Sequence, residues 1–271
     1  MYMSSVGVHL TITRLPGFHI DCISFDIMHG LHLGVLPVVI GSCMLLLLQS
    51  NYFNSAVAGA WHVRFAKQLE TAWVRFKDFL RPFELSTSQP KFSVARLTMA
   101  SLGDPPVWKG KAGDNMIVAR WLLHEWLIKA RTTQLEADQR VASTLWGYVR
   151  STDILSSAGL FFTDSELEQL EKARAAALEC HSLLASDAIA SNLQVWRTIP
   201  KHHYIDHNLR PSWPDGGRLN PGHQWCFADE DFLGRLIRMC DSRTTSDRIV
   251  HKYLLRLHLM IVKGSVSIPQ L

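Results

Sequence analysis

The 271-residue sequence predicts a mainly α-helical protein with one or two short strands near its N-terminus. Apolar residues recur at spacings of three and four over long stretches, which is the pattern of an amphipathic helix; one such series is Trp61, Phe65, Leu69 and Trp73. A looser, β-branched alternation that is typical of strands occurs in VGVHLTIT, within residues 1–25. Because 47% of the residues are apolar and 19% are charged, the chain can bury a sizeable core.

The expected helices are separated by loops, and they cover about residues 26–49, 55–83, 115–130, 136–157, 163–186, 193–209, 229–239 and 247–262. Within the first, Leu33–Leu48 is apolar on every side, which predicts a helix at the centre of the fold. This run has sixteen residues and is shorter than the ~20 that a bilayer requires.

Thr163 and Glu166 form a capping box at a helix start. Residues 211–222 hold three prolines and three glycines and predict a loop.

Bulk composition narrows the class of protein. The net charge of +4 and the pI of about 8.8 are compatible with binding to nucleic acid and are also common in other soluble domains. The five cysteines are scattered, without a Cys-x-x-Cys pair, so we expect a reducing compartment and no disulfide framework. The N-terminus lacks a basic region followed by an apolar run and does not read as a secretory signal.

Asp26 and His29 lie at the start of the expected central helix, about one turn apart and on the same side. One interpretation is a carboxylate and an imidazole at the rim of an active site. The other is an aspartate that caps the helix and a histidine that is satisfied within the core. The residues alone favour the second interpretation.

Two further segments carry candidate ligands. His203 and His207 share a helix face at a spacing that can bind zinc, but no motif supplies further ligands, so histidines packed in a polar core are the simpler interpretation. Lys109 and Lys111 precede a helix and could reach a phosphate backbone, or they could be part of a solvated loop. Phosphate-binding loops, dinucleotide motifs and nucleophile elbows are absent from the sequence.

The segment HQWCFADEDFLGRL places three consecutive acids, Asp229, Glu230 and Asp231, at the start of an apolar helix. Acids at this position complement the helix dipole, so the start of a helix is sufficient to explain them. It does not explain why the preceding residues 223–227 are so aromatic.

In combination, these motifs resemble the C-terminal part of an RNase H-like DDE transposase. The resemblance rests on the Asp-x-x-His pair of Asp26 and His29, the apolar Leu33–Val35, the segment Pro200–His203, and the acid-bearing helix Phe227–Leu236. The chain is most similar to CACTA (EnSpm-like) elements and to transposon-derived proteins of dinoflagellate genomes. The resemblance covers most of the chain through short motifs.

By this resemblance, Glu230 matches the third catalytic acid and a metal ligand, and Asp26 and His29 match the catalytic Asp-x-x-His pair. The implied chemistry is phosphoryl transfer on DNA, in which carboxylates hold two Mg²⁺ ions about 4 Å apart. The family's first two aspartates lie upstream of the pair, where this chain has only the acid Asp21. At least one of them is missing, so we expect a truncated or decayed copy that is inactive alone and holds no Mg²⁺.

The resemblance also implies an incomplete RNase H-like fold: residues 1–25 as a remnant of the catalytic core, residues 26–210 as a helical insertion domain, and residues 211–271 as a loop and C-terminal helices that carry the last acid. It implies DNA as partner, the nucleus as location and no association with membranes. The sequence does not set the oligomeric state. Two alternatives remain: a non-catalytic helical interaction domain, and a membrane-associated protein built on Leu33–Leu48.

Overall fold

The computed structural model describes residues 26–210 and 218–227. The chain divides into two compact units, Met1–Gln224 and Trp225–Leu271. The described residues are mainly helical, which confirms the prediction of a mainly α protein, and their β structure is limited to an isolated antiparallel bridge between Phe161 and Leu219. The predicted strands of residues 1–25 and the predicted helices beyond residue 228 lie outside the described residues.

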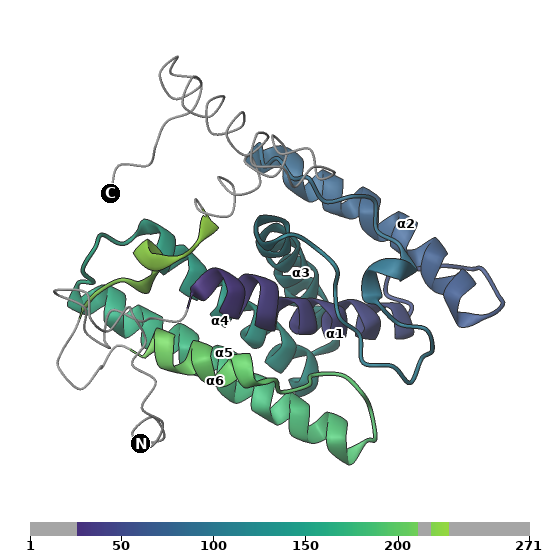
Figure 1. Cartoon of the computed structure of the whole chain (residues 1–271). Coiled ribbons are helices and arrows are strands. Elements are labelled where there is room, and N and C mark those ends of the chain that lie inside the picture. The colour runs from purple at the N-terminus through teal and green to yellow at the C-terminus, as the bar shows by residue number, and fades with distance from the viewer. Residues whose placement is uncertain (1–25, 211–217, 228–271) are drawn as a thin grey trace, which may run out of the picture. The chain divides into compact units, whose positions relative to one another are not determined.

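The helices of the first unit follow the predicted order (Figure 1). They are η3 (Met28–Val35), α1 (Leu36–Gln49), α2 (Trp61–Leu80), α3 (Ala112–Thr133), α4 (Glu136–Ser157), α5 (Asp164–Ala190) and α6 (Pro200–Leu209), with short 3-10 helices η4 (Arg81–Phe83), η5 (Val94–Leu97) and η6 (Pro221–Gln224). The bounds of α4 are those predicted, and the capping box of Thr163 and Glu166 opens α5.

One prediction was wrong: residues 193–199 are not helical, and α6 begins only at Pro200. Pro200 occupies the first position of the helix, where a missing N–H costs nothing. It also disfavours helical backbone angles in the residue before it, and Ile199 is accordingly extended. Trp196 has φ +58°, a left-handed conformation that interrupts any helix through the segment.

The segment Met28–Gln49 forms the centre of the first unit, as its all-round apolar sequence predicted. In Figure 1, η3 and α1 run through the middle of the helices. Among the described residues, Met28–Gln49 is long and apolar enough to cross a membrane, and 89% of its most apolar window is buried inside the protein. A helix covered on all sides in this way is typical of a protein core.

The first turns of this central segment are π-helical, which the sequence analysis did not anticipate. Leu36 donates its backbone N–H to the carbonyl of Leu31, five residues earlier. The next residue, Pro37, has no N–H to donate, and its ring would crowd the carbonyl of Leu33 in a regular α-helix. The wider π turns relieve this crowding. Because π turns are rare and are often found at functional sites, η3 is a candidate location for a functional site.

Helices α4 and α5 pack at very short range because small residues meet between them. A Cβ atom on Gly147 would lie 2.6 Å from the backbone nitrogen of Ala177 and would also clash with the carbonyl of Ala173. Ala173 and Ala177 are buried. The contact therefore depends on glycine at position 147.

Aromatic rings fill the space between α2, α3 and the segment that leads into α3. Neighbouring ring centroids lie 5.0 to 6.2 Å apart in a cluster formed by Phe53, Trp73, Phe76, Phe92, Trp108 and Trp121. The buried carboxylate of Glu125 borders this cluster. It forms an ion pair with Arg75 at 2.5 Å and accepts hydrogen bonds from Tyr52 and the Trp121 indole. These bonds compensate the cost of burying its charge.

Candidate functional site

The start of η3 brings the side chains of Asp26 and His29 together. The Asp26 carboxylate accepts hydrogen bonds from the backbone N–H groups of Met28 and His29, at 3.1 and 2.9 Å. These are amides of the first turn, which lack partners inside a helix, so Asp26 caps the helix. The same carboxylate lies 2.5 Å from the ring nitrogen Nδ1 of His29.

The exposure of the pair separates the two interpretations that the sequence left open. The side chain of His29 is 47% exposed and that of Asp26 is 16% exposed. The interpretation of His29 as a core histidine is therefore wrong, whereas the capping role of Asp26 is confirmed. A carboxylate that accepts Nδ1–H holds the imidazole in the tautomer with its lone pair on Nε2. This arrangement suits a general base or an imidazole that orients a ligand.

Lys201, the second residue of α6, connects the start of η3 to a distant part of the chain. Its ammonium donates a hydrogen bond to the His29 carbonyl at 2.8 Å, across 172 positions. Its aliphatic stem lies against Gly34, where a Cβ atom would overlap with it. One turn along each helix, Ile205 packs against Gly30 in the same way. The two glycines allow α6 to approach η3 closely, and the Asp-x-x-His motif thereby meets the segment Pro200–His203.

His32, the second histidine of η3, is buried and links η3 to two other helices. Its Nε2 lies 3.4 Å from the Thr152 hydroxyl of α4, and its carbonyl accepts a hydrogen bond from Asn115 of α3 at 2.8 Å. Burial lowers the pKa of His32 to about 4, Asp26 opposes this shift, and Arg120 adds to it. The ring is therefore neutral near pH 7, and its position indicates a structural role.

Three cations gather at the start of α3, beside η3, and we call them the α3 cation cluster: Arg96, Lys109 and Lys111. The Arg96 guanidinium donates to the Lys109 carbonyl at 2.9 Å, and Lys111 is the residue before α3. Among the residues that the structure describes, no carboxylate forms an ion pair with any of the three. The nearby carboxylate of Asp114 is buried and accepts hydrogen bonds from residues 87–88. The cluster therefore presents positive charge that is not neutralised locally.

Sequence reasoning missed a pair of buried histidines, His181 of α5 and His202 of α6. Their ring centroids lie 4.2 Å apart, and Trp196 packs edge-on against His181 at 5.8 Å. Burial lowers the pKa of His181 to about 3, with a further contribution from His202, and burial lowers the pKa of His202 to about 4. Both rings are therefore neutral near pH 7 and pack between the helices, where His202 Nδ1 accepts a hydrogen bond from the Ile199 N–H at 3.1 Å.

His203 and His207 share the exposed face of α6, as their spacing predicted, with ring centroids 4.4 Å apart. They do not pack in a polar core, so that interpretation was wrong for this pair. Within the described ranges, no third histidine, cysteine or carboxylate ligand joins them in a group that could hold a metal ion. A zinc site needs further ligands, so the described residues do not support one here.

Glu230, together with Asp229 and Asp231, falls outside the described residues, as does Asp21. The structure thus brings Asp26, His29 and Lys201 together and leaves the position of the last acid as a prediction. No protein-family model, no curated protein and no solved structure matches the chain.

Proposed function

We propose that the chain is a fragment or degenerate copy of an RNase H-like DDE transposase, which contacts DNA and is inactive alone. The observation that supports this proposal is the contact between the Asp26/His29 motif and the segment Pro200–His203, through Lys201. These two motifs carry a large part of the resemblance, and they are 172 positions apart at the contacting residues. A chance co-occurrence of short motifs would not require them to touch.

The described side chains suit contact with a phosphate backbone. Lys201, at the start of α6, donates a hydrogen bond to the His29 carbonyl. The α3 cation cluster precedes α3, whose Asn115 contacts the His32 carbonyl of η3. Both of these helices therefore begin with positively charged side chains. Lysine and arginine contacts to phosphates dominate the affinity of proteins for DNA and do not depend on base sequence. We therefore expect binding that is weakly selective and sensitive to salt.

The described residues do not by themselves fit a two-magnesium site. Mg²⁺ prefers oxygen ligands, and two-metal phosphoryl transfer requires several carboxylates. In the described part of the candidate site, Asp26 is the carboxylate, and it already binds two backbone amides and the His29 ring. By the resemblance, Glu230 is the expected metal ligand of the intact family. The proposal therefore expects no phosphoryl-transfer activity from the described residues alone.

The proposal is tested by fluorescence anisotropy of a labelled 20-base-pair duplex titrated with the whole chain at several salt concentrations. We expect log K to fall linearly with log salt. If each residue of the α3 cation cluster contacts one phosphate, the triple alanine variant should reduce that slope by about 2.7. A charge-matched control replaces Lys67, Arg81 and Lys172, which are exposed and paired with carboxylates three or four residues away. Absence of duplex binding by the wild-type chain at low salt would refute the proposal.

A second measurement addresses the expected lack of activity. The wild-type chain should not nick supercoiled plasmid in Mg²⁺ or Mn²⁺ above a protein-free blank. Nicking that disappears in Glu230→Gln would contradict the expectation of an inactive copy and would assign Glu230 to the reaction, because the variant removes a metal-binding charge.

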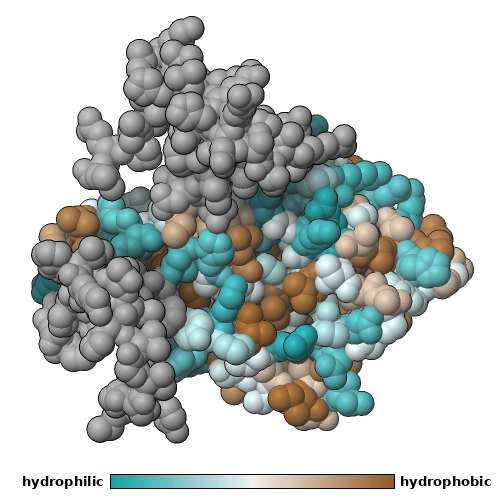
Figure 2. Space-filling view, viewed as in Figure 1, coloured by the Kyte–Doolittle hydropathy of each residue, from teal (hydrophilic) through white to brown (hydrophobic). Residues whose placement is uncertain are grey.

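The alternative function is a non-catalytic helical interaction domain, and the exposed apolar side chains favour it. Ile189 is 79% exposed, and Phe83, Leu135 and Phe161 are also well exposed. Figure 2 shows, however, that hydrophobic and hydrophilic residues are interspersed over the described part of the visible face. Single exposed apolar residues are normal on protein surfaces. Stable self-association in light scattering, together with no DNA binding, would favour this alternative.

A further inference from the structure

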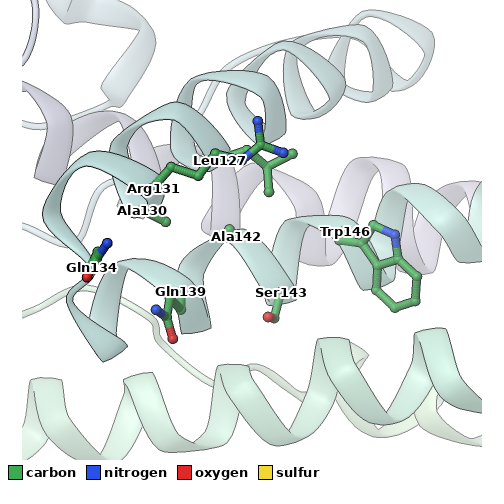
Figure 3. Close-up of a pocket in the computed structure, with 8 residues that line it drawn as sticks. All are labelled: Leu127, Ala130, Arg131, Gln134, Gln139, Ala142, Ser143 and Trp146. Carbon is green, nitrogen blue, oxygen red and sulfur yellow. The ribbon is translucent and has the colours of Figure 1, made fainter.

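A groove of about 620 Å³ lies between α3 and α4, away from the contacts of η3 (Figure 3). It is lined by Leu127, Ala130, Arg131, Gln134, Gln139, Ala142, Ser143 and Trp146. Figure 3 shows Gln134 at one end and Trp146 at the other. The volume falls within the range of sites that hold small molecules, which is about 300 to 1,000 Å³.

Helical spacing explains why these side chains share the groove. Gln139, Ser143 and Trp146 follow one another at spacings of four and three along α4, so they lie on one face. On the other side of the groove, Leu127 and Arg131 of α3 are four residues apart, and Gln134 follows Arg131 by three. The small side chains of Ala130 and Ala142 are buried and form an apolar floor. The Trp146 ring is 41% exposed, so one side of a large aromatic surface is accessible from solvent.

The polar side chains around this floor are not used elsewhere in the described part of the chain. No side-chain hydrogen bond or ion pair among the described residues involves Arg131, Gln134 or Gln139. By contrast, the neighbouring cations Lys129 and Arg140 are each paired with carboxylates. The groove therefore carries one uncompensated positive charge, an accessible indole at one end and two primary amides toward the other end.

Gln134 has a further unusual feature. It ends α3 in the left-handed conformation, with φ +54°, which glycine adopts without strain and glutamine does not. The amide at this position is thus held at some cost in stability. Replacement by glycine removes the amide without harming the helix end, which gives a variant that separates binding from folding.

We propose that the α3–α4 groove binds an unpaired nucleotide of a single DNA strand, with the base on Trp146 and the phosphate near Arg131. This inference rests on the proposed function and specifies that the DNA bound in the groove is single-stranded. A nucleotide combines a planar base with a negatively charged phosphate, which matches an accessible indole in the same groove as one cation. The two amides lie toward the other end of the groove, where they can form hydrogen bonds with the neighbouring nucleotide of the strand. A base inside a duplex cannot enter a concave groove, so the strand must be unpaired.

The test measures binding of the whole chain to a labelled 12-nucleotide single strand, to the matching duplex, and to deoxyadenosine monophosphate. Because stacking of one base is worth about 1 to 3 kcal/mol, Trp146→Ala should weaken single-strand binding roughly tenfold. Trp146→Phe should restore most of it, and Arg131→Ala and Gln134→Gly should each weaken it severalfold. Duplex binding should change less than about twofold in all four variants, because the α3 cation cluster is intact.

Phe161→Ala, which removes a different exposed aromatic ring, is the matched control and should bind the single strand like the wild type. If Trp146→Ala, Arg131→Ala and Gln134→Gly all bind it like the wild type while duplex binding persists, the groove assignment is overturned and the proposed function stands. If the wild type binds the single strand through Trp146 but does not bind the duplex, the groove assignment holds and the proposed function fails. Saturable binding of the mononucleotide without binding of the strand would overturn the assignment to a strand.

Discussion

Acidification from pH 7.5 to pH 5 should destabilise the protein through three buried histidines, His32, His181 and His202. Burial lowers their folded-state pKa values to about 4, about 3 and about 4, from an ordinary value of 6.5. Between these values and 6.5 the unfolded chain binds more protons than the folded chain, so stability is fully present above pH 6.5 and is lost as the pH falls.

The loss of stability depends on how far the assay pH lies below the ordinary histidine pKa. At pH 5, which is about 1.5 pH units below 6.5, each neutral buried histidine costs about 2 kcal/mol of stability, at about 1.4 kcal/mol per unit. Three such residues together give about 6 kcal/mol, which is comparable with the whole stability of many domains. Stopping at pH 5 keeps the carboxylates ionised, since their ordinary pKa values are near 4.

The assay is urea denaturation of the whole chain, followed by tryptophan fluorescence at pH 7.5, 6.5, 5.5 and 5. The variant His181→Phe removes one titrating ring and keeps an aromatic side chain beside Trp196, so it should reduce the loss of stability by about one third. His62→Phe, at an exposed position of α2, is the control for replacement of a histidine by phenylalanine. Equal unfolding free energies at pH 7.5 and pH 5 in the wild type would refute the reasoning.

The remaining predictions concern stability and can be measured by urea or thermal denaturation at pH 7.5. Gly147→Ala should destabilise the protein by about 3 kcal/mol or more, because the new Cβ would overlap with α5 backbone; a wild-type melting temperature would contradict the close α4–α5 contact. Glu125→Ala should cost about 3 kcal/mol and Glu125→Gln less, since the amide keeps an acceptor for the Trp121 indole; equal effects would mean that the hydrogen bond contributes nothing. Thr163→Ala should cost about 1 kcal/mol through loss of the capping box, and no change would contradict that role.

Much of the helical architecture could be predicted from the sequence because its signals are local. Apolar periodicity located α2 and α4, a capping box located the start of α5, and an all-round apolar run located the central helix. The π-helical turns of η3 could not be predicted, since they depend on how Pro37 is accommodated within a buried helix. The late start of α6 could have been inferred from Pro200, which disfavours helical backbone angles in the residue before it.

The candidate site was predictable only in part. The contact between Asp26 and His29 follows from their spacing on a helix, whereas the exposure of His29 depends on tertiary packing. The bond from Lys201 to the His29 carbonyl spans 172 positions, and no local pattern specifies such a partner. Glycines at positions 30 and 34 are the one sequence signal for it, because they allow another helix to approach.

The central claim is that the surface next to η3 contacts DNA. It is tested most directly by photo-cross-linking the whole chain to a duplex that carries 4-thiothymidine, followed by mass spectrometry of the cross-linked peptides. We predict cross-links in residues 108–111, which lead into α3, and in residues 200–203, at the start of α6 next to η3. Cross-links confined to the outer faces of α2 or α5, or no cross-links at all, would contradict it.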